Sequence, residues 1–310
     1  MFLIGFILLL LIEELFLGCL HLRWSDHYSE TIYVPIHVPI NTHRKPNETK
    51  IAIVSVVYNN SNSQEYELAE NTVKCYATLH KYTYIKLNLE SEKNLLKSCP
   101  GKDFMFQRHC VISNLMKENE DTIDWILFID SDIGVVNPNH LIEEYIDEDA
   151  DIILYDRLYN YEITAGTYIV KNNEFARTFL LNWSQYEYKV QPNSFQASVT
   201  DNAAIHEVIL DEFCNDCHLN IRQHCTKLWK KMKNYNELFV YESCARSLLG
   251  IRDVYESKSG TLQQRSISNR WARDGWQTHS RWSTDDFMFH GWKKSQLNGF
   301  RFGSWISPLR

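Results

Sequence analysis

The sequence predicts an α/β fold in which helices flank a parallel sheet. Short apolar runs rich in β-branched residues alternate with longer segments whose apolar residues recur at helical spacing, a pattern typical of such sheets. With 44% hydrophobic and 13% aromatic residues, the 310-residue chain can build a sizeable core. No linker divides the chain after residue 48, so we expect one domain over residues 49–310.

The first half of this domain shows the alternation most clearly. Residues 51–57 (IAIVSVV) form a continuous apolar run, as expected for a strand buried on both faces. Residues 64–80 follow with apolar side chains at helical spacing. Further elements are expected in this order: a strand at 82–89, a helix at 104–117, a strand over DWILFIDSD at 124–132 and a strand at 150–156.

The second half of the domain is less regular. Residues 162–172 are expected to form a strand pair or a bent strand near Gly166. Residues 257–285 are polar and rich in Ser, Arg and Trp, which predicts a loop. The other expected elements are helices at 174–189 and 200–213 and late strands at 237–244 and 286–293.

The N-terminus differs in composition from the rest of the chain. Residues 2–12 (FLIGFILLLLI) are an unbroken apolar run that would span roughly 16 Å as a helix, about half of a bilayer core. Because Glu13 and Glu14 interrupt this run, residues 1–23 are interpreted as a signal sequence or a type II signal anchor, with an uncleaved anchor favoured. A buried apolar helix is the alternative. Residues 24–48 are typical of a stem or linker.

Glycosylation sequons and cysteines agree with a lumenal or extracellular domain. Sequons begin at Asn47, Asn59 and Asn182, and the chain has eight cysteines. Setting Cys19 aside leaves seven, so at least one would be free or bonded to another chain. The formal net charge of -7 argues against a nucleic-acid binder, which usually has a basic face.

One cysteine-rich stretch allows two interpretations. In CNDCHLNIRQHC, the residues Cys214, Cys217, His224 and Cys225 offer a set of zinc ligands. Their spacing is unusual for a zinc site, and disulfides are favoured in an oxidising lumen.

The most informative stretch is WILFIDSDIGVVNP, residues 125–138. Asp130 and Asp132 stand at the end of the expected strand, and ligands of open α/β sheets bind beyond the carboxyl ends of the strands. Two carboxylates so close in a turn can converge on one Mg²⁺ or Mn²⁺ ion, since both ions prefer oxygen ligands. The alternative is that the aspartates only form a turn or cap a helix.

Six segments resemble, in order, glycosyltransferases of the GT-A fold, in which helices flank a mixed sheet. Residues 125–138 resemble their D-x-D motif, which binds Mn²⁺ and the sugar-nucleotide diphosphate. ITAGTYIVKNNEFARTFLLNW resembles a segment of the Golgi galactosyl/mannosyltransferase family first described in yeast and shared with plant xyloglucan xylosyltransferases. The other four segments are IAIVSVVYNN, MFQRHCVISNLM, TDNAAIHEVI and FMFHGW. The whole layout is most similar to a nematode-expanded family known as a domain of unknown function.

The resemblance implies roles for individual residues. It implies that Asp130, Asp132 and His290 hold Mn²⁺ or Mg²⁺, and that Asp201 and Asn202 act at the reacting sugar. It further implies that the nucleotide sugar is bound by Val57, Tyr58, Arg108, Ser131, Ala165, Gly166, Gly291 and Lys293.

The function implied is a metal-dependent glycosyltransferase that moves a hexose from a nucleotide-diphosphate sugar to a glycan or glycoprotein, with anomeric retention. The resemblance also implies a Golgi membrane protein with a lumenal catalytic domain, or a secreted protein if the signal is cleaved. Thr164 and Thr200 depart from the family's usual residues, which leaves open a catalytically inactive, lumenal carbohydrate-binding protein on the same fold. A hydrolase ranks last, because glycosidase carboxylates lie about 5–10 Å apart and flank the scissile bond.

Several of these residues have simpler interpretations. Asp201 precedes an apolar-periodic segment and could cap its helix. His290 could be a packed, hydrogen-bonded residue of an aromatic strand. The late tryptophans Trp271, Trp276 and Trp282 could stack on acceptor sugars, or could form a packing cluster.

Overall fold

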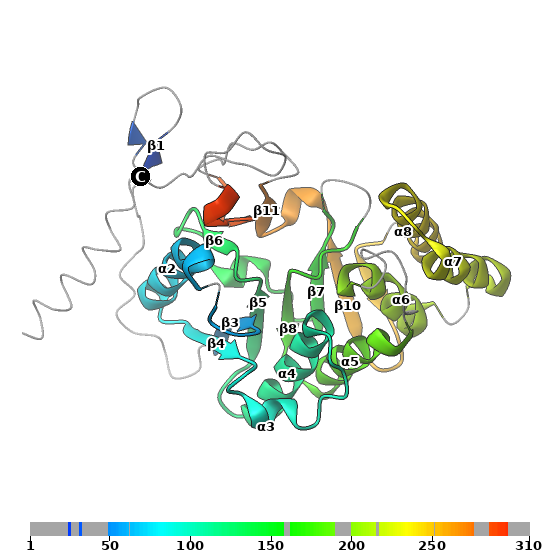
Figure 1. The fold of residues 1–310 in the computed structure, drawn as a ribbon, viewed down its shortest axis with the longest axis horizontal. Coiled ribbons are helices and arrows are strands. Elements are labelled where there is room, and N and C mark those ends of the chain that lie inside the picture. Colours follow the sequence, from blue (N-terminus) through cyan, green and yellow to red (C-terminus); the bar gives the residue numbers. More distant parts are fainter. Residues whose placement is uncertain are drawn as a thin grey trace, which may run out of the picture.

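A seven-stranded mixed sheet forms the centre of the computed structural model (Figure 1). The structure describes residues 24–25, 31–32, 49–61, 63–157, 162–189, 200–214, 217–250, 252–275 and 285–296. The strands lie in the order β4-β3-β5-β8-β7-β10-β9. Their bounds are β3 (Ile51–Val57), β4 (Thr83–Asn88), β5 (Trp125–Ile129), β7 (Ile152–Tyr155), β8 (Thr167–Lys171), β9 (Val254–Glu256) and β10 (Thr261–Arg265).

The sheet is mixed because β8 runs antiparallel to both of its neighbours. Strands β4, β3 and β5 are mutually parallel, and β10 is parallel to β7. No described helix lies between β7 and β8, and the bridge between Asp156 and Ile163 marks a short connection. A short connection can join only antiparallel strands. The parallel sheet expected from the alternation is therefore wrong for β8, while the mixed sheet flanked by helices is confirmed.

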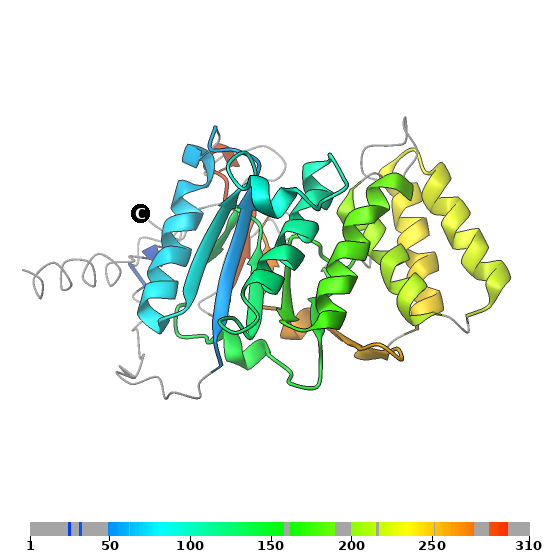
Figure 2. The same ribbon diagram turned by 90° about the horizontal axis from the view of Figure 1, so that it is seen from below.

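Helices cover both faces of this sheet (Figure 2). In β3, Ile51 and Ile53 belong to one hydrophobic cluster and Ala52 and Val54 to the other, as alternation along a doubly buried strand requires. Helix α2 (Ser63–His80) packs on the first face, and α4, α5, α6 and α8 pack on the second. The remaining bounds are α3 (Lys93–Leu96), α4 (Phe104–Glu118), α5 (Glu174–Ser184), α6 (Asp201–Phe213), α7 (Leu219–Lys231) and α8 (Tyr235–Leu249).

A small second sheet connects distant parts of the chain. Its order is β11 (Ala272–Asp274), β12 (Met288–His290) and β6 (Ile133–Val135). Strand β12 pairs antiparallel with β6, which places His290 opposite Ile133, and parallel with β11, which places His290 opposite Asp274. This sheet therefore brings residue 290 beside the D-S-D turn. Short 3-10 helices complete the described elements: η1 (Ile142–Tyr145), η2 (Gln185–Lys189), η4 (Ile267–Asn269) and η5 (Lys294–Gln296).

Two expected elements of the second half are wrong. Residues 237–244 lie in helix α8 instead of a strand, because Asn234 caps the helix and Leu238, Tyr241 and Ala245 are buried at helical spacing. The expected loop over 257–285 contains β10 and β11; residues 276–284 lie outside the described part. The strands expected at 82–89, 124–132, 150–156 and 286–293 and the helices expected at 64–80, 104–117 and 200–213 are confirmed with changes of bounds; the third strand ends at Ile129, before the two aspartates.

The expected signal or anchor at residues 1–23 lies outside the described residues. Within the expected stem, β1 (Trp24–Ser25) pairs antiparallel with β2 (Thr31–Ile32). Among the helices that the structure describes, none is long and apolar enough to cross a bilayer.

Disulfides replace the alternative zinc site. Cys214 bonds Cys217, and Cys225 bonds Cys244, so three of the four zinc-ligand candidates lie in disulfides. A third disulfide joins Cys99 to Cys110, and Cys75 is disulfide-bonded as well. No cysteine in the described part of the chain is free, so the expected unpaired cysteine is not found there. Disulfides of this kind are typical of an oxidising compartment.

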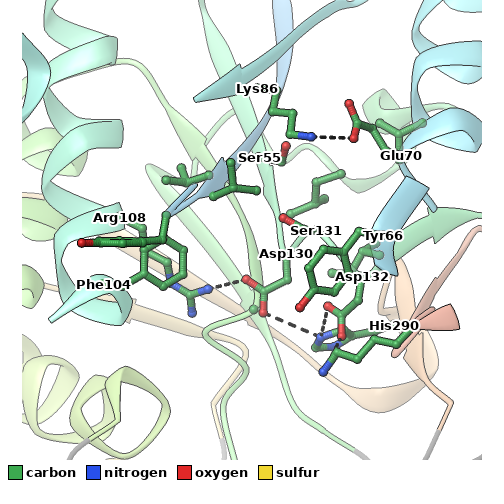
Figure 3. A pocket seen from close by; sticks show the side chains of 18 of the residues that line it. Ser55, Tyr66, Glu70, Lys86, Phe104, Arg108, Asp130, Ser131, Asp132 and His290 are labelled. Atoms are coloured by element: carbon green, nitrogen blue, oxygen red, sulfur yellow. Dashed lines mark hydrogen bonds and ion pairs between the residues drawn. The ribbon is translucent and has the colours of Figure 1, made fainter. Parts of the chain in front are cut away.

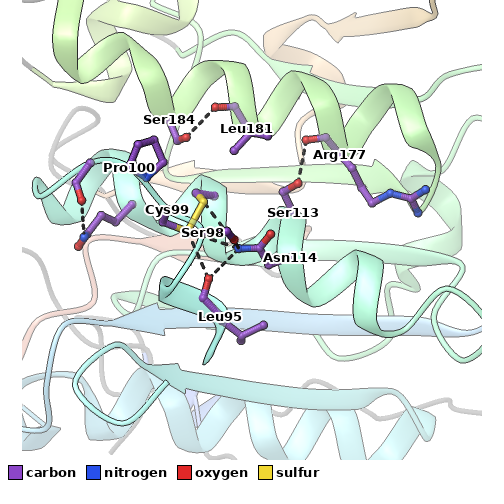
Figure 4. Close-up of a disulfide and its surroundings, with 12 residues drawn as sticks. Leu95, Ser98, Cys99, Pro100, Ser113, Asn114, Arg177, Leu181 and Ser184 are labelled. Carbon is purple, nitrogen blue, oxygen red and sulfur yellow. Dashed lines mark hydrogen bonds between the residues drawn. A yellow bond between two sulfur atoms is a disulfide. The ribbon is translucent and has the colours of Figure 1, made fainter. Parts of the chain in front are cut away.

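The Cys99–Cys110 disulfide ties the loop before α4 to that helix (Figure 4). We expect the Cys99→Ser/Cys110→Ser double variant to lose about 3 kcal/mol of unfolding free energy, because opening a loop with a sequence separation of 11 restores entropy to the unfolded chain. Urea unfolding measures the loss. The matched Cys214→Ser/Cys217→Ser variant, with a separation of 3, should lose about 2 kcal/mol. Equal stability of wild type and the first variant would contradict this expectation.

Candidate functional site

A cavity of about 460 Å³ opens at the carboxyl ends of β3 and β5. Figure 3 shows Asp130, Asp132 and His290 together at one end of it and the ion pair of Lys86 with Glu70 at the other. The cavity is also lined by Ser55, Val57, Tyr58, Asn59, Tyr66, Phe104, Arg108, Ser131, Arg157, Gly166, Asn202 and Lys293. Its position beyond the strand ends agrees with the place where open α/β sheets bind ligands.

The D-S-D turn is held by backbone hydrogen bonds on two sides. The Asp130 amide donates to the Gly166 carbonyl at 2.8 Å, which fixes the turn to the start of β8. The Asp132 carbonyl accepts from the amides of Gly291 and Trp292, at 3.1 and 2.8 Å. Gly291 has a φ of +99°, a conformation that favours glycine. The residues after His290 are therefore bound directly to the turn that carries both carboxylates.

Two carboxylates and one imidazole converge at this turn. The Nε2 atom of His290 lies 3.3 Å from Asp132 Oδ1 and 3.7 Å from Asp130 Oδ2. One ligand atom from each of the three residues lies within 4.8 Å of the other two. On the cavity side, Lys293 Nζ lies 3.2 Å from Asp132 Oδ2.

The charges of this cluster are strongly coupled. Burial tends to raise the pKa of Asp132, but His290 and Lys293 outweigh it and hold that pKa below its usual value. Burial tends to lower the pKa of His290, yet Asp132 and Asp274 raise it to about 9. Burial raises the pKa of Asp130, although Arg108 opposes the effect. Two local cations thus compensate carboxylates that would otherwise be costly to bury.

The cluster fits a divalent cation of the Mn²⁺ or Mg²⁺ type. Carboxylate oxygens suit both ions, and an imidazole nitrogen is also a ligand of transition metals. Gly166 faces the same point: a Cβ there would lie 2.8 Å from Asp130 Oδ2 and 2.9 Å from His290 Cε1. Because residue 166 is a glycine, it places no side chain in the space between Asp130 and His290.

At the wall of the cavity, Arg108 joins Asp130 to Asp201. Its guanidinium pairs with Asp130 and also with Asp201, where Nε lies 3.0 Å from Oδ2. His109 Nε2 lies 3.0 Å from the same Asp201 oxygen, and its ring stacks on Trp183 at 3.7 Å. Arg108, His109 and Asp201 are all buried. Arg108 outweighs the effect of burial and keeps the pKa of Asp201 below its ordinary value, so this carboxylate stays charged.

Asp201 neither caps helix α6 nor lines the cavity. Thr200 is the N-cap of α6 and Asp201 is its first residue, so Asp201 is not the cap. Asp201 is fully buried against Arg108 and His109 and is not among the residues that line the cavity. Asn202 does line it, and its Oδ1 accepts from the Ala165 amide at 2.9 Å.

The other residues that were expected to bind the nucleotide sugar differ in their place relative to the cavity. Val57, Tyr58, Ser131, Gly166 and Lys293 line the cavity together with Arg108. Ala165 is buried, and Gly291 acts through its backbone bond to Asp132. Their contact with a nucleotide sugar stays a prediction.

Trp271 is not available as an acceptor platform. It is 1% exposed, packs edge-on against Tyr155 at 4.7 Å, and its Nε1 donates to Thr167 Oγ1 at 2.8 Å. The packing interpretation is correct for Trp271, because a ring buried in the core has no face for a sugar. Trp276 and Trp282 lie outside the described residues.

Sequence reasoning missed two sets of polar residues. Lys86 and Glu70, 2.6 Å apart, line the far end of the cavity; a lysine inside the expected strand 82–89 was the available signal. Asp274 contacts His290, and Arg157 pairs with Asp274. No local pattern pointed to them, because the contact of Asp274 with His290 is made by the register of β11 with β12.

Comparisons with known proteins identify the family but leave the activity open. Residues 73–304 match the model of a family described as "Protein of unknown function, DUF273", which confirms the expected domain of unknown function. No curated protein matches the chain.

Several solved structures with similar folds are glycosyltransferases by name. A glycosyltransferase involved in glycosylation of the major capsid of PBCV-1 is 14% identical, with a TM-score of 0.45. The match covers 77% of this chain and 92% of that one. Mouse xyloside xylosyltransferase 1 is 8% identical (TM-score 0.36; 78% and 97% covered). A Drosophila galactosyltransferase 7 mutant, in complex with manganese, UDP-Gal and xylobiose, is 14% identical (TM-score 0.30; 70% and 93% covered). At scores below 0.5, we draw nothing about substrate or mechanism from them.

Proposed function

Because the chain belongs to the DUF273 family of proteins of unknown function, we propose its activity from its own site: metal-dependent transfer of a hexose from a nucleotide-diphosphate sugar. The observation that carries the proposal is the convergence of Asp130, Asp132 and His290 at one end of the cavity. Asp130, Asp132 and His290 would hold Mn²⁺ or Mg²⁺. When bound, the metal would stabilise negative charge on a departing diphosphate.

Cationic side chains beside this cluster would favour the binding of an anionic ligand. Lys293 lines the cavity and is within 3.2 Å of Asp132, so it can turn to a phosphate oxygen once the metal compensates that carboxylate. Arg108, clamped between Asp130 and Asp201, fixes the orientation of Asp130. Lys293 would thus bind the diphosphate, while Arg108 would keep a metal ligand in place.

The rest of the cavity suits the remainder of a nucleotide sugar. A volume of about 460 Å³ lies in the usual range of ligand pockets, about 300–1,000 Å³. Tyr58 is 56% exposed and meets Phe104 edge-on at 6.3 Å, which offers an aromatic surface for a base. Asn202 would contact the sugar, and Asp201 would act through Arg108 and His109 rather than by direct contact.

The finer parts of the proposal concern the acceptor and the compartment. We propose a glycan or glycoprotein acceptor, retention at the anomeric carbon and a place in the secretory pathway, in the Golgi membrane if residues 1–23 are an uncleaved anchor. The disulfides support the oxidising compartment. The alternative, an inactive carbohydrate-binding protein on the same fold, would bind sugar without turning over any donor.

A panel of nucleotide sugars tests the proposal on the full chain. With Mn²⁺, wild type should hydrolyse or transfer from one donor, and Asp132→Asn should lower that rate at least 100-fold, since the metal's charge stabilisation is worth several kcal/mol. Asp149→Asn, at an exposed acid, is the matched control and should keep the wild-type rate. Turnover without metal, or equal rates in wild type and Asp132→Asn, would refute the proposal; sugar binding with no turnover would favour the inactive alternative.

A further inference from the structure

We propose that Asp274 is a positioning residue that fixes the tautomer and orientation of His290, and that Arg157 holds Asp274 in place for this purpose. The inference rests on the metal site of the proposed function. It extends that site by the buried Asp274 and by Arg157, which lines the cavity; neither is one of the three proposed metal ligands.

The register of the small sheet makes the contact between Asp274 and His290. The two residues are cross-strand partners in the parallel pair of β11 and β12. Asp274 Oδ1 lies 2.8 Å from His290 Nδ1, and Asp274 is 1% exposed. The Gly275 amide also donates to the His290 carbonyl at 2.8 Å, so the backbone on both sides of the contact is fixed.

A carboxylate at Nδ1 determines which nitrogen of His290 can bind a metal. A neutral imidazole carries one N–H, and a carboxylate accepts a hydrogen bond but cannot donate one. In the neutral form that a metal ligand requires, the one remaining proton therefore stays on Nδ1, and Nε2 has a free lone pair. Nε2 is the atom that faces Asp132 and Asp130, at 3.3 and 3.7 Å. Asp274 thus selects the ligating form of the ring.

Arg157 in turn holds Asp274 with two prongs. Its Nε lies 3.1 Å from Asp274 Oδ2 and its second nitrogen 3.0 Å from Oδ1. Its third nitrogen donates to Glu162 Oε1 at 2.8 Å, and its amide donates to the Glu162 carbonyl at 2.9 Å. This bidentate geometry is directional, because the guanidinium is a rigid planar fork. The carboxylate of Asp274 therefore has little freedom to turn away from His290.

Asp274→Asn tests the tautomer directly while changing little in shape. The guanidinium of Arg157 can only donate, so it should take the amide oxygen and leave the amide NH₂ facing Nδ1. The imidazole proton then moves to Nε2, which can no longer bind a cation. Mn²⁺ alone is the probe, and the electron paramagnetic resonance signal of free Mn²⁺ gives its affinity without any substrate. We expect a 10–100-fold weaker affinity.

Two further variants separate positioning from folding. Arg157→Lys keeps the positive charge but loses the fork, and should weaken Mn²⁺ binding less than Asp274→Asn does. Asp156→Asn is the matched control, because Asp156 is the adjacent acid and pairs with Arg246 at 3.2 Å. Whatever its melting temperature, this variant should bind Mn²⁺ with the affinity of wild type.

The outcomes are distinct for the two proposals. If wild type binds Mn²⁺ and loses it in Asp132→Asn, but binds it equally well in Asp274→Asn and Arg157→Lys, only the positioning role is overturned. If Asp274→Asn does not fold, an unchanged affinity in Arg157→Lys still overturns it. If wild type itself binds no Mn²⁺, both the metal assignment and the positioning role are overturned.

Discussion

Replacing Arg108 by Met is expected to lower the free energy of unfolding by about 3–5 kcal/mol. Arg108 is buried and pairs with both Asp130 and Asp201. Its removal would leave Asp201, which is fully buried, with only the neutral ring of His109 as a side-chain partner. In the wild type, burial lowers the pKa of His109 to about 4, although the bond to Asp201 opposes this effect, so the ring beside Arg108 is neutral at neutral pH.

Urea unfolding at pH 7 measures this loss, and a surface ion pair provides its control. Lys189 lies 3.0 Å from Asp211, and both side chains are about half exposed. Lys189→Met should therefore cost less than about 1 kcal/mol, as exposed pairs do. A similar small loss in Arg108→Met would mean that the buried carboxylates do not depend on the guanidinium.

Replacing Glu242 by Gln is expected to stabilise the protein by about 3 kcal/mol at pH 7. Glu242 lies in α8 with 1% of its surface exposed, and neither of its carboxylate oxygens has a hydrogen-bond partner among the residues described. Burial and then the charge of Glu162 raise its pKa from 4.5 to about 9, although Arg157 opposes this effect. The native state therefore keeps a proton that the unfolded chain releases.

The sign of the pH dependence follows from this difference. Between pH 4.5 and 9 the native state binds the additional proton, so the Glu242 contribution makes the protein less stable as the pH rises. The ordinary pKa of 4.5, which Glu242 has in the unfolded chain, lies about 2.5 units below pH 7. At 1.36 kcal/mol per unit, this difference gives the expected gain for Gln, which is neutral in both states. Unfolding free energies at pH 4.5 and pH 7 should show a gain only at pH 7.

A surface glutamate serves as the control for this pH dependence. Glu118→Gln, at an exposed position at the end of α4, should give no gain that grows with pH. Equal gains at pH 4.5 and pH 7 in Glu242→Gln would indicate better packing and contradict the proton-linked effect.

Local sequence patterns predicted the elements that carry the carboxylates but not the contacts that complete the site. The strand Ile51–Val57 and the D-S-D after β5 were predictable, because a doubly buried strand and a polar turn each have a local signature. Helix α8 was mistaken for a strand because its Phe-Val-Tyr run has strand preference; tertiary packing against α6 overrides it. Asp274 was not predictable, since only the pairing of β11 with β12 gives it a role.

The backbone bonds from Gly291 and Trp292 to the carbonyl of Asp132 have a consequence for the order of biosynthesis. A ribosome makes the D-S-D turn long before it makes His290 and Lys293. Until those two residues emerge, Asp130 and Asp132 lack the cations of the C-terminal segment and repel each other at the end of β5. The nascent chain can therefore form the central strands β3, β4 and β5 before the carboxylate cluster, which takes shape only after residues 290–293 have been made.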